Sequence, residues 1–305
     1  CVLKTNTIKD FFAYNCYFYR DGNGASADQY GYQNDYMFAF DYSTFKLANV
    51  VFNNCKFGYT QYNLENDDYI NNNDDVSTDT TKYPQYKCKS YIYGININTF
   101  TLEKCIINHV YSTQNRDSNS SVYFGTLNLI RITSHKYSVI DCQYNILYRN
   151  SINGNLTPSY QALVFNGYDR GKAIVKNLEI NKIYTKTSSI EGTQCAYFNN
   201  ADTTVEHVKI NCKVMGGGNV TSRSTWYDSG SVMNVIGLNT VYVNDIQADL
   251  SDSCFYEKDI LYVSTMRDDV GNPRSKVSNI FVKFVKNIIV KDVIKIILCS
   301  IRQKI

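Results

Sequence analysis

A six-residue pattern recurs along the chain: an apolar residue, any residue, Asn or Asp, an apolar residue, any residue and a last apolar residue. Nine segments follow it, with Lys, Asp or His replacing Asn in some: Ala13–Phe18, Phe52–Phe57, Leu102–Ile107, Val139–Tyr144, Val175–Ile180, Val205–Ile210, Val243–Ala248, Val277–Val282 and Val290–Lys295. Successive segments start 30 to 50 residues apart, except that the last two are 13 residues apart. Self-similarity at such a period is typical of repeat architectures.

The third position of each segment holds a residue that tolerates unusual backbone angles. These residues are Asn15, Asn54, Lys104, Asp141, Asn177, His207, Asp245, Asn279 and Asp292. Asn, Asp and His are the non-glycine residues that most readily take the left-handed conformation needed for a tight bend. Alternate flanking positions are apolar, as in a strand with one buried face. Each segment is therefore predicted to be a strand, a one-residue bend and a second strand.

A further strand is predicted upstream of most of these bends. The candidates are Met37–Asp41, Tyr91–Asn96, Leu127–Ile132, Ala162–Asn166, Cys195–Phe198, Val232–Ile236 and Ile260–Val263. Three short strands per repeat, without a helical stretch, favour an all-β, single-stranded right-handed parallel β-helix of about eight irregular coils. Leucine-rich repeats and β-propellers fit less well, since they need a shorter fixed period or four-stranded hairpin blades. We expect residues 1–285 to form this solenoid and residues 286–305 a C-terminal cap or tail, with a trimer interface as the alternative role of the tail.

Four cysteines follow the predicted bends directly: Cys16, Cys55, Cys105 and Cys142. Stacked repeats would place them in one interior column. The absence of CxxC pairs argues against a disulfide framework. We interpret the four as small buried apolar residues, and a metal column or redox pair as the alternative.

The charge and the apolar runs of the chain argue against two classes of binding partner, nucleic acids and membranes. A net charge of +3, with scattered Lys and Arg, gives no footprint for nucleic acid. The longest apolar run, Ile288–Leu298, is interrupted by Lys291, Asp292 and Lys295, so no membrane span is predicted.

The bend column and the three-strand coils resemble the right-handed parallel β-helix (pectate-lyase-like) superfamily, which includes pectate lyases, polygalacturonases, phage tailspikes and bacterial surface proteins. The resemblance extends from about Ile8 to Val285. It implies a polysaccharide or cell-surface glycan bound along one side of the protein, and an extracellular, cell-surface or virion location. It bears on the fold and not on the function.

Long segments between the third strand of one repeat and the first of the next are predicted to line one edge as loops: Gly58–Lys89, Ser112–Ser121, Tyr148–Tyr160, Thr185–Thr193, Met215–Gly230 and Ser251–Lys258. One of them holds the chain's single Trp. Trp226 and Tyr227 offer aromatic faces to sugar rings, and Arg223 and Asp228 offer hydrogen bonds to hydroxyls. These four are the predicted ligand contacts, and a Trp folded against the protein's flank is the alternative.

Catalytic and metal-binding signals are weak. Asp67, Asp68, Asp74 and Asp75 cluster in the first long loop and would suit Ca²⁺, but the spacing is not that of an EF-hand, and a solvated loop is favoured. Arg131, on a predicted strand, is the best-placed candidate for the base of a lyase, although an ordinary outward-facing Arg is the favoured explanation. Asp67 and Asp68 are the other weak candidates for catalytic residues. We therefore predict no cofactor, with Ca²⁺ as the alternative.

Three functions remain open. The first is a carbohydrate-facing module like a tailspike or adhesin, for which a homotrimer is the assembly to test. The second is a polysaccharide lyase or glycoside hydrolase, whose carboxylates would come from different repeats. The third is a structural stalk. Acidic residues and Arg converging on the face of the upstream strands would favour the enzyme.

Overall fold

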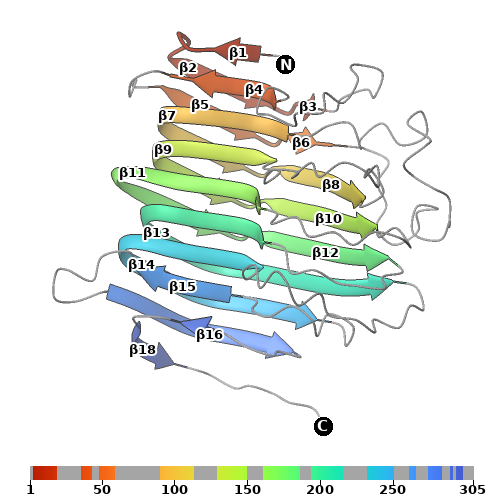
Figure 1. The fold of residues 1–305 in the computed structure, drawn as a ribbon, viewed down its shortest axis with the longest axis vertical. Helices are drawn as coiled ribbons and strands as arrows, with labels where there is room; N and C mark the ends of the chain where they lie inside the picture. Colours follow the sequence, from red (N-terminus) through yellow and green to blue (C-terminus); the bar gives the residue numbers. More distant parts are fainter. Residues whose placement is uncertain are drawn as a thin grey trace, which may run out of the picture.

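The structure, a computed structural model of the 305-residue chain, describes residues 3–18, 36–42, 48–58, 90–112, 129–149, 161–185, 194–215, 232–250, 261–265, 274–283, 289–290 and 293–297. These residues are all-β and contain no helix (Figure 1). The strands are β1 (Leu3–Thr5), β2 (Asp10–Tyr14), β3 (Tyr17–Phe18), β4 (Tyr36–Asp41), β5 (Asn49–Asn53), β6 (Lys56–Phe57), β7 (Ser90–Glu103), β8 (Ile106–Ser112), β9 (Ile130–Ile140), β10 (Gln143–Arg149), β11 (Gln161–Lys176), β12 (Glu179–Thr185), β13 (Gln194–Met215), β14 (Met233–Leu250), β15 (Leu261–Thr265), β16 (Arg274–Lys283), β17 (Ile289–Val290) and β18 (Val293–Ile297).

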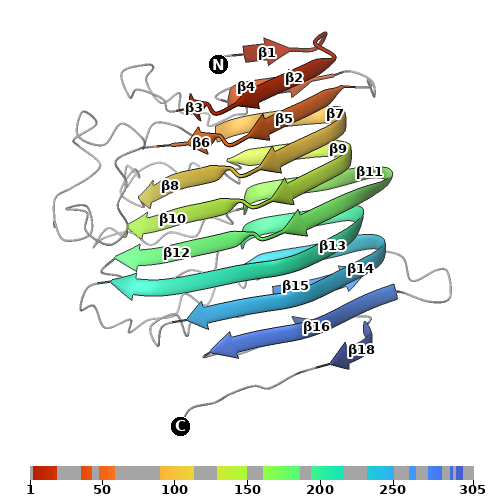
Figure 2. The ribbon, with the colours of Figure 1, turned by 180° about the vertical axis from the view of Figure 1, so that it is seen from behind.

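Every strand pairing in this structure is parallel, and strands from successive repeats lie beside one another (Figures 1 and 2). We name three faces by their strands. The first face holds β1, β4, the opening halves of β7, β9, β11, β13 and β14, and then β15. The second holds β2, β5, the later parts of β7, β9 and β11, the middle of β13 and β14, and β16. The third holds β3, β6, β8, β10, β12 and the ends of β13, β14 and β16.

The predicted bends are confirmed wherever the structure describes them. All eight bend residues from Asn15 to Asn279 have positive φ, between 51° and 55°, whereas Asp292 lies outside the described residues. Two left-handed residues were not predicted: Asn96 (φ 56°) in β7 and Asn200 (φ 57°) in β13 turn the chain from the first face to the second. The seven upstream strands also form where they were expected.

The expected fold, a right-handed parallel β-helix of about eight coils with three short strands each, is wrong. The 18 strands that the structure describes form one parallel sheet, which contains a closed four-stranded parallel barrel with extra strands and is not a clear right-handed β-helix. Several strands run unbroken across corners, as the 22 residues of β13 and the 18 of β14 do. The physical reason is that a single left-handed residue redirects the chain while its neighbours keep their hydrogen bonds: the amides of Asn98 and Thr99 both donate to the carbonyl of Ala48.

A continuous apolar core fills the interior. Aromatic rings stack through it from one repeat to the next, with Tyr137, Phe165 and Phe198 separated by 5.5–6.3 Å between centroids. The cysteine column is confirmed, since Cys55, Cys105 and Cys142 are buried, Cys16 is half-buried, and all four thiols are free. Each of the three buried thiols donates to a main-chain carbonyl of the neighbouring repeat, as Cys105 does to Phe52 at 3.3 Å.

An amide ladder runs along the third face. Asn145 Nδ2 donates to Asn108 Oδ1, Asn181 Nδ2 to Asn145 Oδ1 and Asn211 Nδ2 to Asn181 Oδ1, each at 2.8 Å. Because the four residues are in register on β8, β10, β12 and β13, each amide supports the next. The ladder therefore fixes the register of this face.

Near the C-terminus, β17 pairs with β15 and β18 pairs with β16. The parallel pairing thus continues past residue 285, and the assignment of residues 286–305 to a cap or tail stays a prediction. None of the residues that the structure describes belong to a helix long and apolar enough to cross a membrane.

Candidate functional site

The outward side of the first face carries a column of side chains that are polar at all but one position. Register places Tyr93, Arg131, Val164, Tyr197, Asn234 and Tyr262 on six adjacent strands, from β7 to β15. Each precedes an inward residue of the core, such as Ile132 after Arg131 and Phe198 after Tyr197. The alternation of a strand therefore points these side chains outward. Arg131 is exposed and the three tyrosines are half-buried.

The hydroxyls of Tyr93 and Tyr197 stay protonated at neutral pH. Burial raises the pKa of Tyr93, with the Asp41 carboxylate raising it further and the Arg131 guanidinium opposing that effect. Burial also raises the pKa of Tyr197, to which the neighbouring Tyr262 adds. The Tyr93 ring lies 4.9 Å from the ring of Tyr36. The column therefore offers aromatic surface, neutral hydroxyls and one cation.

Two buried amide oxygens accompany the column. Asn234 lies between Tyr197 and Tyr262 in the register, and Asn199 lies on the next outward column of the same face. Asn234 is 7% exposed and Asn199 8%, and the Oδ1 atom of each has no hydrogen-bond partner among the residues that the structure describes. A buried acceptor without a donor costs about 1–3 kcal/mol. Ordered water satisfies many buried acceptors of this kind in folded proteins.

Few side chains suited to acid–base catalysis lie on the first face among the residues that the structure describes. Asp41 is the single carboxylate among the first-face residues that the structure describes, and glycoside hydrolysis by the usual route needs two carboxyl groups. Within the described ranges, no cluster of three or more His, Cys, Asp or Glu is arranged to hold a metal ion.

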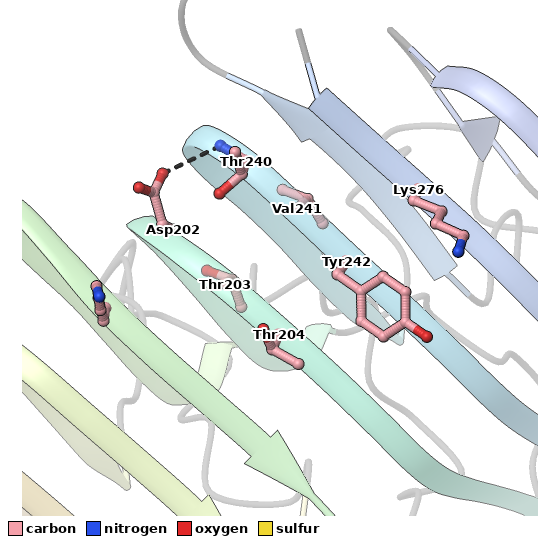
Figure 3. Close-up of a pocket in the computed structure, with 8 residues that line it drawn as sticks. Asp202, Thr203, Thr204, Thr240, Val241, Tyr242 and Lys276 are labelled. Carbon is pink, nitrogen blue, oxygen red and sulfur yellow. Dashed lines mark hydrogen bonds between the residues drawn. The ribbon is translucent and has the colours of Figure 1, made fainter.

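A shallow depression of about 460 Å³ lies on the second face (Figure 3). Two adjacent outward columns form it: Lys172, Asp202 and Thr240 in one, and Thr204, Tyr242 and Lys276 in the other. Asp202 Oδ1 accepts hydrogen bonds from the amides of Asn239 and Thr240, both at 3.0 Å. The Lys276 ammonium lies 5.5 Å from the centroid of the Tyr242 ring.

Local backbone features place these residues. The left-handed Asn200 turns β13 onto the second face two residues before Asp202. Gly171 precedes Lys172, and a Cβ there would lie 2.1 Å from the carbonyl oxygen of His135, so only glycine permits this approach of β11 to β9. Both corners therefore depend on residues whose backbone is unusually permissive.

Of the site residues predicted from the sequence, the structure describes only Arg131. It lies on β9 as expected, exposed and in register with Tyr93 and Val164. The predicted ligand contacts Arg223, Trp226, Tyr227 and Asp228 lie outside the described residues, as do Asp67, Asp68, Asp74 and Asp75. The interiors of the predicted edge loops lie outside them as well.

Sequence reasoning missed Tyr93, Tyr197 and Tyr262. A signal for them was present: each stands immediately before an inward position of a correctly predicted strand. Aligning those strands on their inward residues would have brought the three tyrosines and Arg131 into one column. The depression on the second face had no comparable signal, because the bend at Asn200 that places Asp202 was not anticipated.

Comparison of the chain with protein-family models, with characterised proteins and with solved structures found no match. The site is therefore interpreted from its own chemistry.

Proposed function

We propose that this protein is a carbohydrate-binding module that holds a polysaccharide or cell-surface glycan against its first face. The observation that carries the proposal is the outward column of Tyr93, Arg131, Tyr197 and Tyr262 on adjacent parallel strands. Tyrosine presents an apolar ring to a sugar and a hydroxyl to its substituents. A cation beside these rings adds hydrogen-bond donors for sugar oxygens.

The spacing of the column suits an extended ligand. Neighbouring strands lie about 4.8 Å apart, so Tyr197 and Tyr262, two strands apart, are separated by about 10 Å, and Tyr93 and Tyr197 by about 14 Å. The column thus extends over a length that a small molecule would not fill.

The first test is a screen of the purified protein against neutral and acidic polysaccharides, with and without calcium. Retention on affinity electrophoresis is read beside the release of reducing ends or unsaturated products. We expect retention without product. Release of product would instead favour the second candidate, a polysaccharide lyase or glycoside hydrolase, and no retention on any polymer would favour a structural stalk.

Variants then locate the site. Tyr197→Ala together with Tyr262→Ala removes two rings from the column and should weaken retention at least tenfold. The matched control is Phe281→Ser, which removes an exposed aromatic side chain from the third face. Equal retention by the double variant and the unmodified protein, with both folded by circular dichroism, contradicts the proposal.

The proposal also implies a location for the protein and a state of assembly. A glycan-binding module of this kind would act outside the cell, on a cell surface or on a virion, and assembly into a homotrimer would multiply its weak contacts with one polymer. Sedimentation equilibrium of the purified chain tests the trimer.

A further inference from the structure

Three lysines on the second face make no ion pair with another residue that the structure describes. Lys136 and Lys172 are exposed and in register on the adjacent strands β9 and β11, and Lys276 lies on β16, beyond β13 and β14. The ion pairs found among the described residues join Lys104 to Glu103, Lys176 to Glu206 and His207 to Asp245. None of them engages Lys136, Lys172 or Lys276.

The position of Lys136 beside Lys172 is unfavourable for the protein alone. Two like charges directly opposite each other on neighbouring strands, about 4.8 Å apart in the backbone, destabilise a sheet. A surface that keeps such a pair unneutralised is suited to an anion from outside, whose binding would relieve the repulsion.

Asp202, the one carboxylate that lines the depression, can offset the charge of only one of the lysines. Asp202 lies next to Lys172 in the register, but its Oδ1 atom already accepts two main-chain hydrogen bonds from the turn at Asn239 and Thr240. Figure 3 shows this carboxylate turned toward Thr240, at the opposite end of the depression from Lys276. Its role is to hold the turn, and the lysines on either side remain available.

We infer that this strip, defined by Lys136, Lys172, Thr204, Tyr242 and Lys276, is a second binding site that takes the anionic groups of a charged glycan chain. Lys172 and Lys276 are three strands apart, about 14 Å in the backbone, so the ligand must carry charges spaced along its length. Between them, Thr204 and Tyr242 are half-buried and offer hydroxyls to uncharged parts of the chain. The two anionic groups that fit ammonium ions in this way are carboxylate and sulfate ester.

A glycan fits this strip better than a nucleic acid. Single-stranded nucleic acids need aromatic side chains on which successive bases stack, and the strip has one ring, Tyr242, with Lys276 already over it. The net charge of +3 over 305 residues is also small for a phosphate-tracking surface. A polymer of sugars with widely spaced charges makes neither demand.

The test measures binding of polygalacturonate, dextran sulfate and uncharged dextran by isothermal titration calorimetry at two salt concentrations. The variant is Lys172→Gln with Lys276→Gln. The control is Lys56→Gln with Lys209→Gln, which makes the same change in net charge on the third face. Poly(dT) serves as the nucleic-acid probe.

We expect the Lys172/Lys276 variant to lose at least tenfold in affinity for one or both charged glycans and the control pair to lose less than threefold. If the variant loses affinity for polygalacturonate alone, the strip binds carboxylate groups. If it loses affinity for dextran sulfate alone, the strip binds sulfate esters. Equal affinities for the two variants overturn the inference, as does tighter binding of poly(dT) than of either glycan.

This inference stands apart from the first-face proposal. Tyr197→Ala with Tyr262→Ala alters the first face only, so it should leave the salt-sensitive binding of charged glycans intact. Failure of one site in these assays therefore does not imply failure of the other.

Discussion

Replacing Lys104 by Asn should stabilise the protein. Lys104 is the only long, flexible side chain among the eight described bend residues of the six-residue pattern, and its φ is 53°. Left-handed backbone costs most residues about 1–2 kcal/mol, and Asn pays less of this cost because its side chain hydrogen-bonds locally. An Asn at this position would also lie beside Asn54, whose own Nδ2 donates to Asn15 Oδ1 at 2.6 Å.

The stability gained from Asn at this position is expected to exceed the stability lost with the ion pair of Lys104. The ion pair of Lys104 with Glu103, at 3.8 Å, is exposed on the lysine side and contributes no more than a few tenths of a kcal/mol. Relief of backbone strain contributes about 0.5–1 kcal/mol, and a further amide hydrogen bond at the surface adds about 0.5 kcal/mol. The net expectation is a stabilisation of about 1 kcal/mol, or a rise of roughly 1–3 °C in Tm for a chain of this size.

Urea unfolding followed by circular dichroism measures this change, with the slope of the transition compared between variants. Lys104→Gln is the matched control, since it removes the same charge without gaining a residue suited to the left-handed region. The reciprocal change, Asn177→Lys, should destabilise by about 1–2 kcal/mol because it also removes the 2.6 Å hydrogen bond to Asp141. If Lys104→Gln stabilises as much as Lys104→Asn, charge and not backbone conformation decides the effect.

Three further predictions follow from the core and the ladders. Asn145→Ala should destabilise by about 2 kcal/mol, because it removes two ladder hydrogen bonds and leaves Asn108 Oδ1 without its donor; unchanged urea unfolding would show that water replaces the amide. Burial raises the pKa of Cys55 to about 11, and the hydrogen bond with Cys142, together with burial, raises the pKa of Cys105. Iodoacetamide at pH 8 should therefore label both thiols slowly in the native protein and rapidly in urea, and fast native labelling by peptide mass spectrometry would contradict their burial. The hydrogen bond from His207 lowers the pKa of Asp245 in the folded protein. The Asp245 carboxylate therefore contributes stability above its unfolded pKa of about 3.9, and this contribution is lost as the pH falls through the lower pKa of the folded state. Asp245→Asn should therefore flatten the fall of Tm below about pH 4, and an identical pH profile for the two proteins would assign the acid sensitivity to other groups.

The bends were predictable from the sequence because their cause is local. A one-residue left-handed turn selects for Asn, Asp or His whatever the surroundings, so Asn15, Asp141 and Asn279 stand out without a structure. The positions of the upstream strands were predictable for a similar reason, the apolar alternation of a half-buried strand. Whether a strand ends at a corner or runs through it depends on hydrogen bonds to the neighbouring repeat, and this is why the expected fold failed. Asn96 and Asn200 lie inside long strands, and no change in local pattern marks them.

The candidate sites were less predictable because outward positions are not constrained by the core. Packing requires an apolar residue at Ile132, Phe165 and Phe198, but it leaves the residue before each free to be Arg, Val or Tyr. Tyr93 and Tyr197 lie 104 positions apart in the chain yet face the same side, because register and not sequence distance sets their spacing. In a parallel sheet of this kind the core determines which positions face outward, and it does not determine the residue types at those positions. Reading function from such a sequence therefore requires the register first, and the column of Tyr93, Arg131, Tyr197 and Tyr262 becomes visible only once it is known.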